Sequence, residues 1–152
     1  MALHDPTNRM GLVRDGLERL LRSRLCASTP AQVGYLAGLE QDRGWMETYS
    51  ERVLRRRDHC LKRIAQIDGL EVEQPGGAFY MFVRLTDEQW ANDDKAFVLQ
   101  LLHEEHVLLV HGSGFSPQLG KGHVRLVYLV TLEVLDEVFD RIERFLKKHR
   151  GH

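Results

Sequence analysis

Arg125 is the side chain whose setting in this sequence best suits chemistry. It lies in the segment 123–128, where apolar residues alternate with others as in a half-buried strand. Successive strand side chains point to opposite faces, so Arg125 points away from Val124, Leu126 and Tyr128 and projects from any face that helices leave uncovered. On pattern alone this is an ordinary solvated arginine, whereas the functional alternative is a carboxylate site, because the planar guanidinium matches both carboxylate oxygens.

The glycine-rich segment 112–122 invites comparison with a phosphate-binding P-loop. A P-loop requires four residues between its glycines and a hydroxyl residue after the lysine. Here five residues separate Gly114 from Gly120, and Gly122 follows Lys121. A helix should come next, yet the residues from 123 onward are strand-like. The segment is therefore interpreted as a connection between strands, whose glycines permit positive φ.

Histidine and cysteine supply the candidate metal ligands. His103 and His106 are three apart in a helical segment, but neither they nor His111 are accompanied by a carboxylate–histidine signature or a cysteine pair. Surface or capping histidines are the ordinary interpretation. Cys26 and Cys60 are too few for a disulfide framework and lack metal spacing. We expect reduced thiols and no bound metal.

The composition is that of a soluble globular protein, with 152 residues, 43% hydrophobic, 28% charged and a formal net charge of −1. Because basic charge is not in excess, we expect neither nucleic acid nor an anionic membrane as a partner. The run Arg55-Arg56-Arg57 falls in a helical pattern and is interpreted as a solvated face. No apolar run approaches the roughly 18 residues of a membrane span, and no secretion signal opens the chain. These features predict a cytoplasmic protein.

Three helices are expected before any strand. The first begins at Gly11, with apolar residues at helical spacing. The second opens with the proline-containing N-terminus at residues 28–30 and extends towards Gly44. The third covers residues 49–65. The apolar stripe of the first helix, from Val13 to Leu21, indicates a partner surface.

The rest of the chain has the order β-β-α-β-β-α. The pattern predicts strands at 70–73, 78–83, 107–110 and 123–130, a helix around 97–102 after cap candidates at 92–94, and a last helix around 135–146. Two helices can cover one face of a four-stranded sheet, which gives an α+β layer arrangement within the broader α/β class.

Four segments resemble the class I (fold type I) pyridoxal-phosphate-dependent aminotransferases, and most of all their alanine type. In chain order they are residues 22–32 (RSRLCASTPAQ), 75–82 (PGGAFYMF), 106–115 (HVLLVHGSGF) and 122–126 (GHVRL). Each would be weak alone, but their order and spacing match the family from about Asp5 to the end of the chain. The resemblance is to the carboxy-terminal domain of an aminotransferase.

This resemblance implies a fold and a division of the chain. The fold would be the family's small domain, a short mixed sheet of about four strands with helices on one face, preceded by connecting helices. Residues 1–44 would be a helical arm that belongs to or contacts a large domain. Residues 45–152 would be the small domain itself.

The resemblance also implies roles for particular residues. Arg125 would bind the substrate α-carboxylate, and Gly77 would belong to the edge of the small domain near the active site. Arg24 aligns with a position from which some relatives contact a distal carboxylate across the dimer, although a structural arginine is the simpler interpretation. The parent enzyme would transfer an amino group between alanine and 2-oxoglutarate with pyridoxal phosphate as cofactor, and its small domain would close on the substrate.

The lysine that forms the family's Schiff base with the cofactor has no counterpart here. The serine-rich context of that residue surrounds none of the chain's lysines, which are Lys62, Lys95, Lys121, Lys147 and Lys148. We therefore expect a fragment that is inactive alone, binds no pyridoxal phosphate, and forms a homodimer or self-associates through its arm. Two alternatives stay open. One is a natural non-catalytic module that binds carboxylates or a partner subunit; the other is a different reaction, as in carbon–sulfur lyases or cyclopropane-carboxylate synthases.

Overall fold

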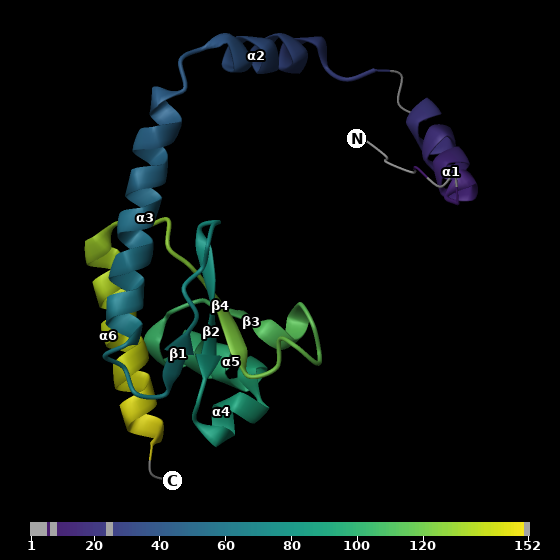
Figure 1. Cartoon of the computed structure of the whole chain (residues 1–152). Helices are drawn as coiled ribbons and strands as arrows, with labels where there is room; N and C mark the ends of the chain where they lie inside the picture. The colour runs from purple at the N-terminus through teal and green to yellow at the C-terminus, as the bar shows by residue number, and fades with distance from the viewer. Residues whose placement is uncertain (1–5, 7–8, 24–25, 151–152) are drawn as a thin grey trace. The chain divides into compact units, whose positions relative to one another are not determined.

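A computed structural model describes residues 6, 9–23 and 26–150 of the chain (Figure 1). The chain divides into two units, of which the first ends at Arg43 and the second begins at Gly44. The first unit contains the helices α1 (Gly11–Arg22) and α2 (Thr29–Glu40). Neither helix has a buried residue. The described part of the first unit therefore has no hydrophobic core of its own.

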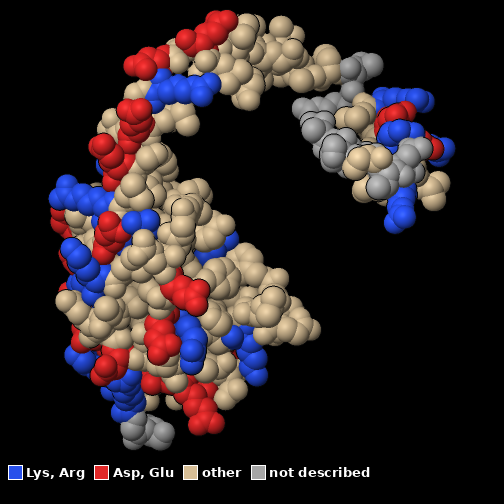
Figure 2. All heavy atoms as spheres, in the orientation of Figure 1, with Lys and Arg blue, Asp and Glu red and all other residues tan. Residues whose placement is uncertain are grey.

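Helix α2 begins where the sequence predicts. Ser28 is its N-cap residue, and a proline occupies the first turn, where the missing N–H has no intrahelical partner to lose. The predicted extension to Gly44 is too long, because the backbone becomes extended at Gln41 (φ −73°, ψ 157°). Figure 2 shows α2 as largely uncharged, which fits a helix whose one ionisable acid is Glu40.

The second unit contains a four-stranded sheet and four helices. Its elements are α3 (Gly44–Ile64), β1 (Leu70–Val72), β2 (Tyr80–Leu85), α4 (Glu88–Asn92), α5 (Asp94–Glu105), β3 (Val110–His111), the 3₁₀ turn η1 (Gly112–Gly114), β4 (His123–Val127) and α6 (Leu132–His149). The strand order is β1-β2-β4-β3. The predicted four strands are confirmed. The sheet is not mixed, however, because every described pairing is antiparallel. Strand β4 lies between β2 and β3, and so separates two strands that run in the same direction.

Helices cover one face of this sheet. Along β2, Met81, Val83 and Leu85 are buried while the alternate residues are exposed, and Val124 and Leu126 of β4 are buried on the same side. These side chains join one core with residues of α3, α5 and α6. In Figure 1, α3 and α6 run side by side along the sheet. The prediction of helices on one face is confirmed, and the opposite face lies open.

One helix was not predicted, and one predicted strand was wrong. Helix α4 has no counterpart in the sequence prediction, because it is too short to display a period and is fixed by Trp90, whose ring lies 5.6 Å from Phe97 and 5.5 Å from Phe145. The predicted strand at 107–110 is reduced to Val110–His111. Helix α5 ends at Glu105, and its C-cap residue His106 has a left-handed backbone (φ 58°). Val107 and Leu109 are then buried in the core without pairing to a strand, while Leu108 is exposed.

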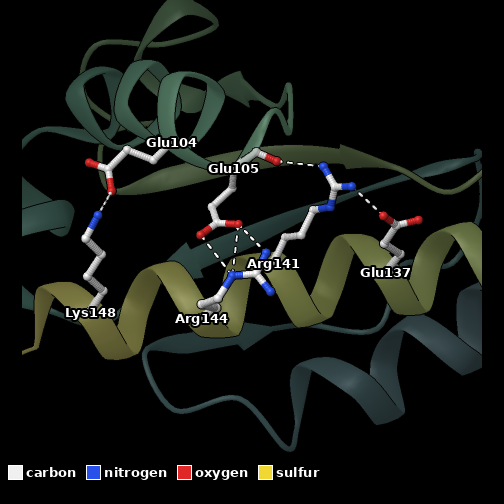
Figure 3. Close-up of polar contacts among 6 residues, drawn as sticks. All are labelled: Glu104, Glu105, Glu137, Arg141, Arg144 and Lys148. Carbon is white, nitrogen blue, oxygen red and sulfur yellow. Dashed lines mark hydrogen bonds and ion pairs between the residues drawn. The ribbon is translucent and has the colours of Figure 1, made fainter.

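Ion pairs join α5 to α6 (Figure 3). The Glu104 carboxylate accepts from Lys148 Nζ at 2.8 Å, and Glu105 pairs with Arg144. Arg141 donates to the Glu105 carbonyl oxygen at 2.9 Å and also pairs with Glu137. These contacts fix the end of α5 against α6.

The charged surface of the second unit is mixed in sign. Figure 2 shows acidic and basic side chains interleaved over α3 and α6. Within the run Arg55-Arg56-Arg57, Arg57 donates to Asp58 Oδ1 at 2.7 Å. Of the helices in the described ranges, none combines the length and the hydrophobicity that a bilayer crossing requires.

Candidate functional site

Arg125 lies in the middle of β4, on the sheet face that the helices leave open. Its direct partners across the sheet are Phe82 of β2 and Val110 of β3. The flanking residues Val124 and Leu126 are 1% and 3% exposed, whereas Arg125 is half-buried. The face predicted from the alternation of the strand is therefore confirmed.

Two aromatic rings hold the Arg125 guanidinium. Its Cζ atom lies 4.6 Å from the centroid of Phe115 and 5.4 Å from that of Tyr80, both within cation–π range. The Arg125 Nε atom is buried and has no hydrogen-bond partner. Across the described residues, no acidic side chain forms an ion pair with this guanidinium. A buried charged donor without an acceptor is costly, so the arrangement suits an anionic ligand.

A cavity of about 380 Å³ opens beside Arg125. Its wall is mostly apolar and comes from β3, β4 and the first half of α6, with Val110, Val127, Val130 and Val134 among its residues. This volume falls within the range of small-molecule pockets, which pair an apolar wall with a few polar groups. Arg125 is among the lining residues, but its guanidinium lies between Tyr80 and Phe115, which do not line this cavity. Arg141, also a lining residue, is paired with Glu137.

Gly77 lies away from this cavity, in the exposed connection between β1 and β2. It lines a second groove, of about 1140 Å³, together with Tyr80 and Arg84. This groove is larger, but Arg84 is already paired with Glu71 at 3.2 Å. The Arg125 guanidinium contacts Tyr80 and lies opposite Phe82, and both of these residues line the larger groove on the open face of the sheet. Tyr80 links the two places, because it lines the groove and contacts Arg125.

The connection before β2 contains a constrained residue that the sequence did not indicate. Ala78, rather than either neighbouring glycine, has a left-handed backbone (φ 63°). The hydroxyl of the buried Tyr128 donates to the Ala78 carbonyl oxygen at 3.2 Å, and the Tyr128 amide donates to the Phe79 carbonyl oxygen at 3.0 Å. Tyr128 therefore fixes the backbone that leads into Tyr80.

The glycine-rich segment is a strand connection, as predicted, but its glycines serve two purposes. Only Gly122 has positive φ (+73°). Gly112 and Gly120 are required by close approach, because a Cβ atom at Gly112 would lie 2.2 Å from the Gly120 carbonyl oxygen. The strand β4 follows directly, which excludes the P-loop geometry.

The remaining candidates do not form a site with Arg125. Arg24 lies outside the described residues. The expectation of a capping histidine is confirmed at His106, the C-cap of α5, and His111 Nδ1 lies 3.0 Å from Ser113 Oγ. No group of three possible metal ligands occurs in the part of the chain that the structure describes. Cys26 is exposed and Cys60 buried, and both are free; burial, and secondarily the Asp136 carboxylate, raise the pKa of the Cys60 thiol to about 12.

Comparison with known protein families shows to which family the chain belongs. A family model described as aminotransferase class I and II matches residues 12–142, a stretch that includes Arg125. The chain belongs to this aminotransferase family. Among the relatives of this aminotransferase chain is the glutamate-pyruvate aminotransferase AlaA of Haemophilus influenzae, 33% identical over 99% of the chain. The alanine aminotransferase of Mycobacterium tuberculosis is 31% identical over 99% of it.

The solved structures include an alanine aminotransferase from Pyrococcus furiosus, which matches 95% of the chain with a TM-score of 0.84 and 43% identity. The chain covers 36% of that structure and 38% and 35% of the two curated relatives. This aminotransferase chain therefore spans about a third of the length of the relatives it matches.

Full-length aminotransferases of this family use pyridoxal phosphate. The lysines of this chain do not fit the Schiff-base role that this cofactor requires. A Schiff base needs an amine whose positive charge is suppressed by its surroundings, but every lysine of this chain is exposed (Lys62, Lys95, Lys121, Lys147 and Lys148). Lys147 and Lys148 also pair with Glu143 and Glu104.

Proposed function

We propose that this chain forms the substrate-carboxylate-binding part of a pyridoxal-phosphate-dependent aminotransferase that acts on alanine and 2-oxoglutarate. The observation behind the proposal is Arg125, which is half-buried between two rings and has a buried, unpartnered Nε. Guanidinium binds a carboxylate through two parallel hydrogen bonds, which fix orientation as well as affinity. In this role Arg125 would hold the substrate in place for chemistry supplied by other parts of the enzyme.

The choice of alanine rests on the relatives. Those named for glutamate-pyruvate or alanine transfer match nearly the whole chain, whereas an aspartate aminotransferase of Thermotoga maritima matches 80% of it at 38% identity. We propose that residues 1–44 are the arm of a large domain and residues 45–152 the small domain, with the break between units at Gly44 in support. Gly77 and Arg24 are proposed as secondary substrate positions. A cytoplasmic location fits the two free thiols.

The first prediction concerns the cofactor. Incubated with pyridoxal phosphate, reduced with borohydride and digested, the isolated chain is expected to show no single lysine labelled in stoichiometric amount. The physical reason is that five exposed lysines react weakly and alike. Peptide mass spectrometry gives the distribution of label. Stoichiometric label at one lysine would overturn the proposal that the cofactor is held elsewhere.

The second prediction concerns Arg125. In a chimera in which this chain replaces the matching third of the Pyrococcus furiosus alanine aminotransferase, Arg125→Lys and Arg125→Ala are expected to lower kcat/KM for alanine at least about 100-fold. Lysine keeps the charge but cannot form the paired contact. Arg84→Lys is the matched control, because Arg84 lies on the same sheet face and pairs with Glu71. Equal losses in the Arg84 and Arg125 variants would contradict the role.

The same chimera separates the alternatives. Alanine transamination that depends on Arg125 supports the proposal. Catalysis of a reaction other than transamination would point to a lyase or synthase. An inactive but folded chimera, together with Arg125-dependent binding of pyruvate by the isolated chain, would favour the non-catalytic carboxylate-binding module.

A further inference from the structure

Asp94 is a buried carboxylate that lies outside the candidate site. Asp94 is 3% exposed, and among the described residues it is the one buried residue with a charged side chain. It opens α5, where the helix dipole favours negative charge. Its Oδ2 atom accepts a hydrogen bond from the backbone amide of Ser113 at 2.7 Å, the short distance typical of a charge-assisted bond.

Ser113, which donates this hydrogen bond to Asp94, belongs to the turn η1. In this turn the Gly112 carbonyl oxygen accepts from the Phe115 amide at 2.9 Å and from the Ser116 amide at 3.3 Å. Gly112 is buried and packed against the backbone of Gly120. The bond from Asp94 therefore ties a compact, internally bonded turn to the first residue of α5.

The turn leads directly into Phe115, whose ring lies 4.6 Å from the Arg125 Cζ atom. The ring is 52% exposed, and its other aromatic neighbour is Phe82 at 5.6 Å. A half-exposed ring is not fixed by core packing alone, so its place over the guanidinium depends on the backbone that precedes it. That backbone is the turn that Asp94 anchors.

We infer that Asp94 is a positioning residue for Arg125, which it holds through Ser113 and Phe115 in the orientation that receives a carboxylate. The inference about geometry stands on contacts alone. Its consequence for catalysis rests on the proposed aminotransferase function, and the two are tested separately.

The geometric test uses NMR of the full chain without any ligand. The Arg125 Nε–H resonance is expected upfield, because Nε is bonded to the Cζ atom that lies 4.6 Å over the Phe115 ring. Phe115→Leu defines the position of the resonance without that ring. Asp94→Ala is expected to move the resonance to the Phe115→Leu position. Asp94→Asn is expected to leave it near the wild-type position, because the carboxamide oxygen still accepts from Ser113.

Asp93→Ala is the matched control. The Asp93 side chain caps α5 by accepting from the Ala96 amide at 2.9 Å, so its loss weakens the same helix end but spares the bond to Ser113. The Arg125 resonance is expected to stay in place in this variant. An unmoved resonance in folded Asp94→Ala, or an equal movement in Asp93→Ala, would overturn the inference whatever the activity of the protein.

The catalytic consequence is read in the chimera. Asp94→Ala is expected to raise KM for alanine about tenfold with a smaller change in kcat, while Asp94→Asn recovers most of the affinity. A chimera that is inactive in every form speaks against the proposed function only. An active chimera in which Asp94→Ala leaves KM unchanged speaks against the positioning role only.

Discussion

At the scale of single residues, Gly122 sets the direction in which the chain enters β4, three residues before Arg125. Its φ of +73° is one that a side chain rarely adopts, and a Cβ atom there would lie 2.9 Å from the Ala91 carbonyl oxygen. Its own carbonyl oxygen accepts from the Leu85 amide at 2.8 Å. The backbone at this point is therefore constrained from both sides.

Gly122→Ala is accordingly expected to lower the free energy of unfolding by about 1–3 kcal/mol, through backbone strain and the contact with Ala91. Urea denaturation measures the effect. Gly76→Ala is the control, because nothing lies within 4 Å of its added Cβ and its φ is not positive. Equal urea midpoints for the two variants would contradict this explanation.

Sequence reasoning at this scale predicted the sheet face of Arg125 but not its neighbours. The alternation of β4 predicts the face of Arg125, because that is a local property of a strand. The contacts with Phe115 and Tyr80 join separate segments, and no local pattern signals them. The left-handed Ala78 was missed for a similar reason: two glycines precede it, and the bond that fixes it comes from Tyr128, fifty residues away in sequence.

At the scale of elements, the attachment of α5 to α6 depends on carboxylates. Hydrogen bonds from Lys148 and then His149 lower the pKa of Glu104, and the hydrogen bond from Arg144 lowers the pKa of Glu105. A group whose pKa is lower in the folded than in the unfolded protein stabilises the fold above its unfolded pKa. That contribution is lost as pH falls through the folded pKa.

The free energy of unfolding is therefore expected to decrease when the pH is lowered below the range in which glutamate ordinarily titrates. This decrease is expected to be smaller in Glu104→Gln and Glu105→Gln. Denaturant midpoints measured from neutral to acid pH test this. Glu73→Gln removes the same charge from the β1–β2 connection, and among the described residues no ion pair involves Glu73. If the two α5 variants lost as much stability at acid pH as the wild-type chain, Glu104 and Glu105 would not be its cause.

Elements with a long period were predictable, and those made by tertiary contacts were not. Helix α6 was found because its apolar residues repeat over several turns, and they are buried as that repeat requires. Helix α4 has five residues and forms around Trp90, which packs between α5 and α6. Residues 107–109 look like a strand because they are apolar, yet they pair with no strand: Val107 and Leu109 are buried in the core, and Leu108 is exposed.

At the scale of the whole molecule, the first unit exposes apolar surface. On α1, Val13, Leu20 and Leu21 are 49%, 69% and 56% exposed, and α2 adds further exposed apolar residues without any buried one. Exposed apolar surface of this kind marks an interaction site. We expect the isolated chain to self-associate through the stripe of α1 from Val13 to Leu21.

Sedimentation velocity over a range of concentrations tests this expectation. Leu20→Lys is expected to weaken association at least about tenfold, since a buried leucine contributes roughly 1.5–3 kcal/mol. Leu12→Lys is the matched control, because it also replaces a leucine of α1 with lysine but at a position outside the stripe. A wild-type chain that is strictly monomeric at high concentration would rule out self-association through this helix.

The burial of Cys60 has a practical consequence for handling the protein. With a pKa near 12 and no exposure, its thiol is almost wholly protonated at neutral pH and out of reach of oxidants and alkylating reagents. Cys26 in the first unit is exposed. Ageing in air would therefore modify Cys26 first, and any covalent dimer that forms would be joined through the first unit. Modification of Cys60 would instead mark molecules whose second unit has opened.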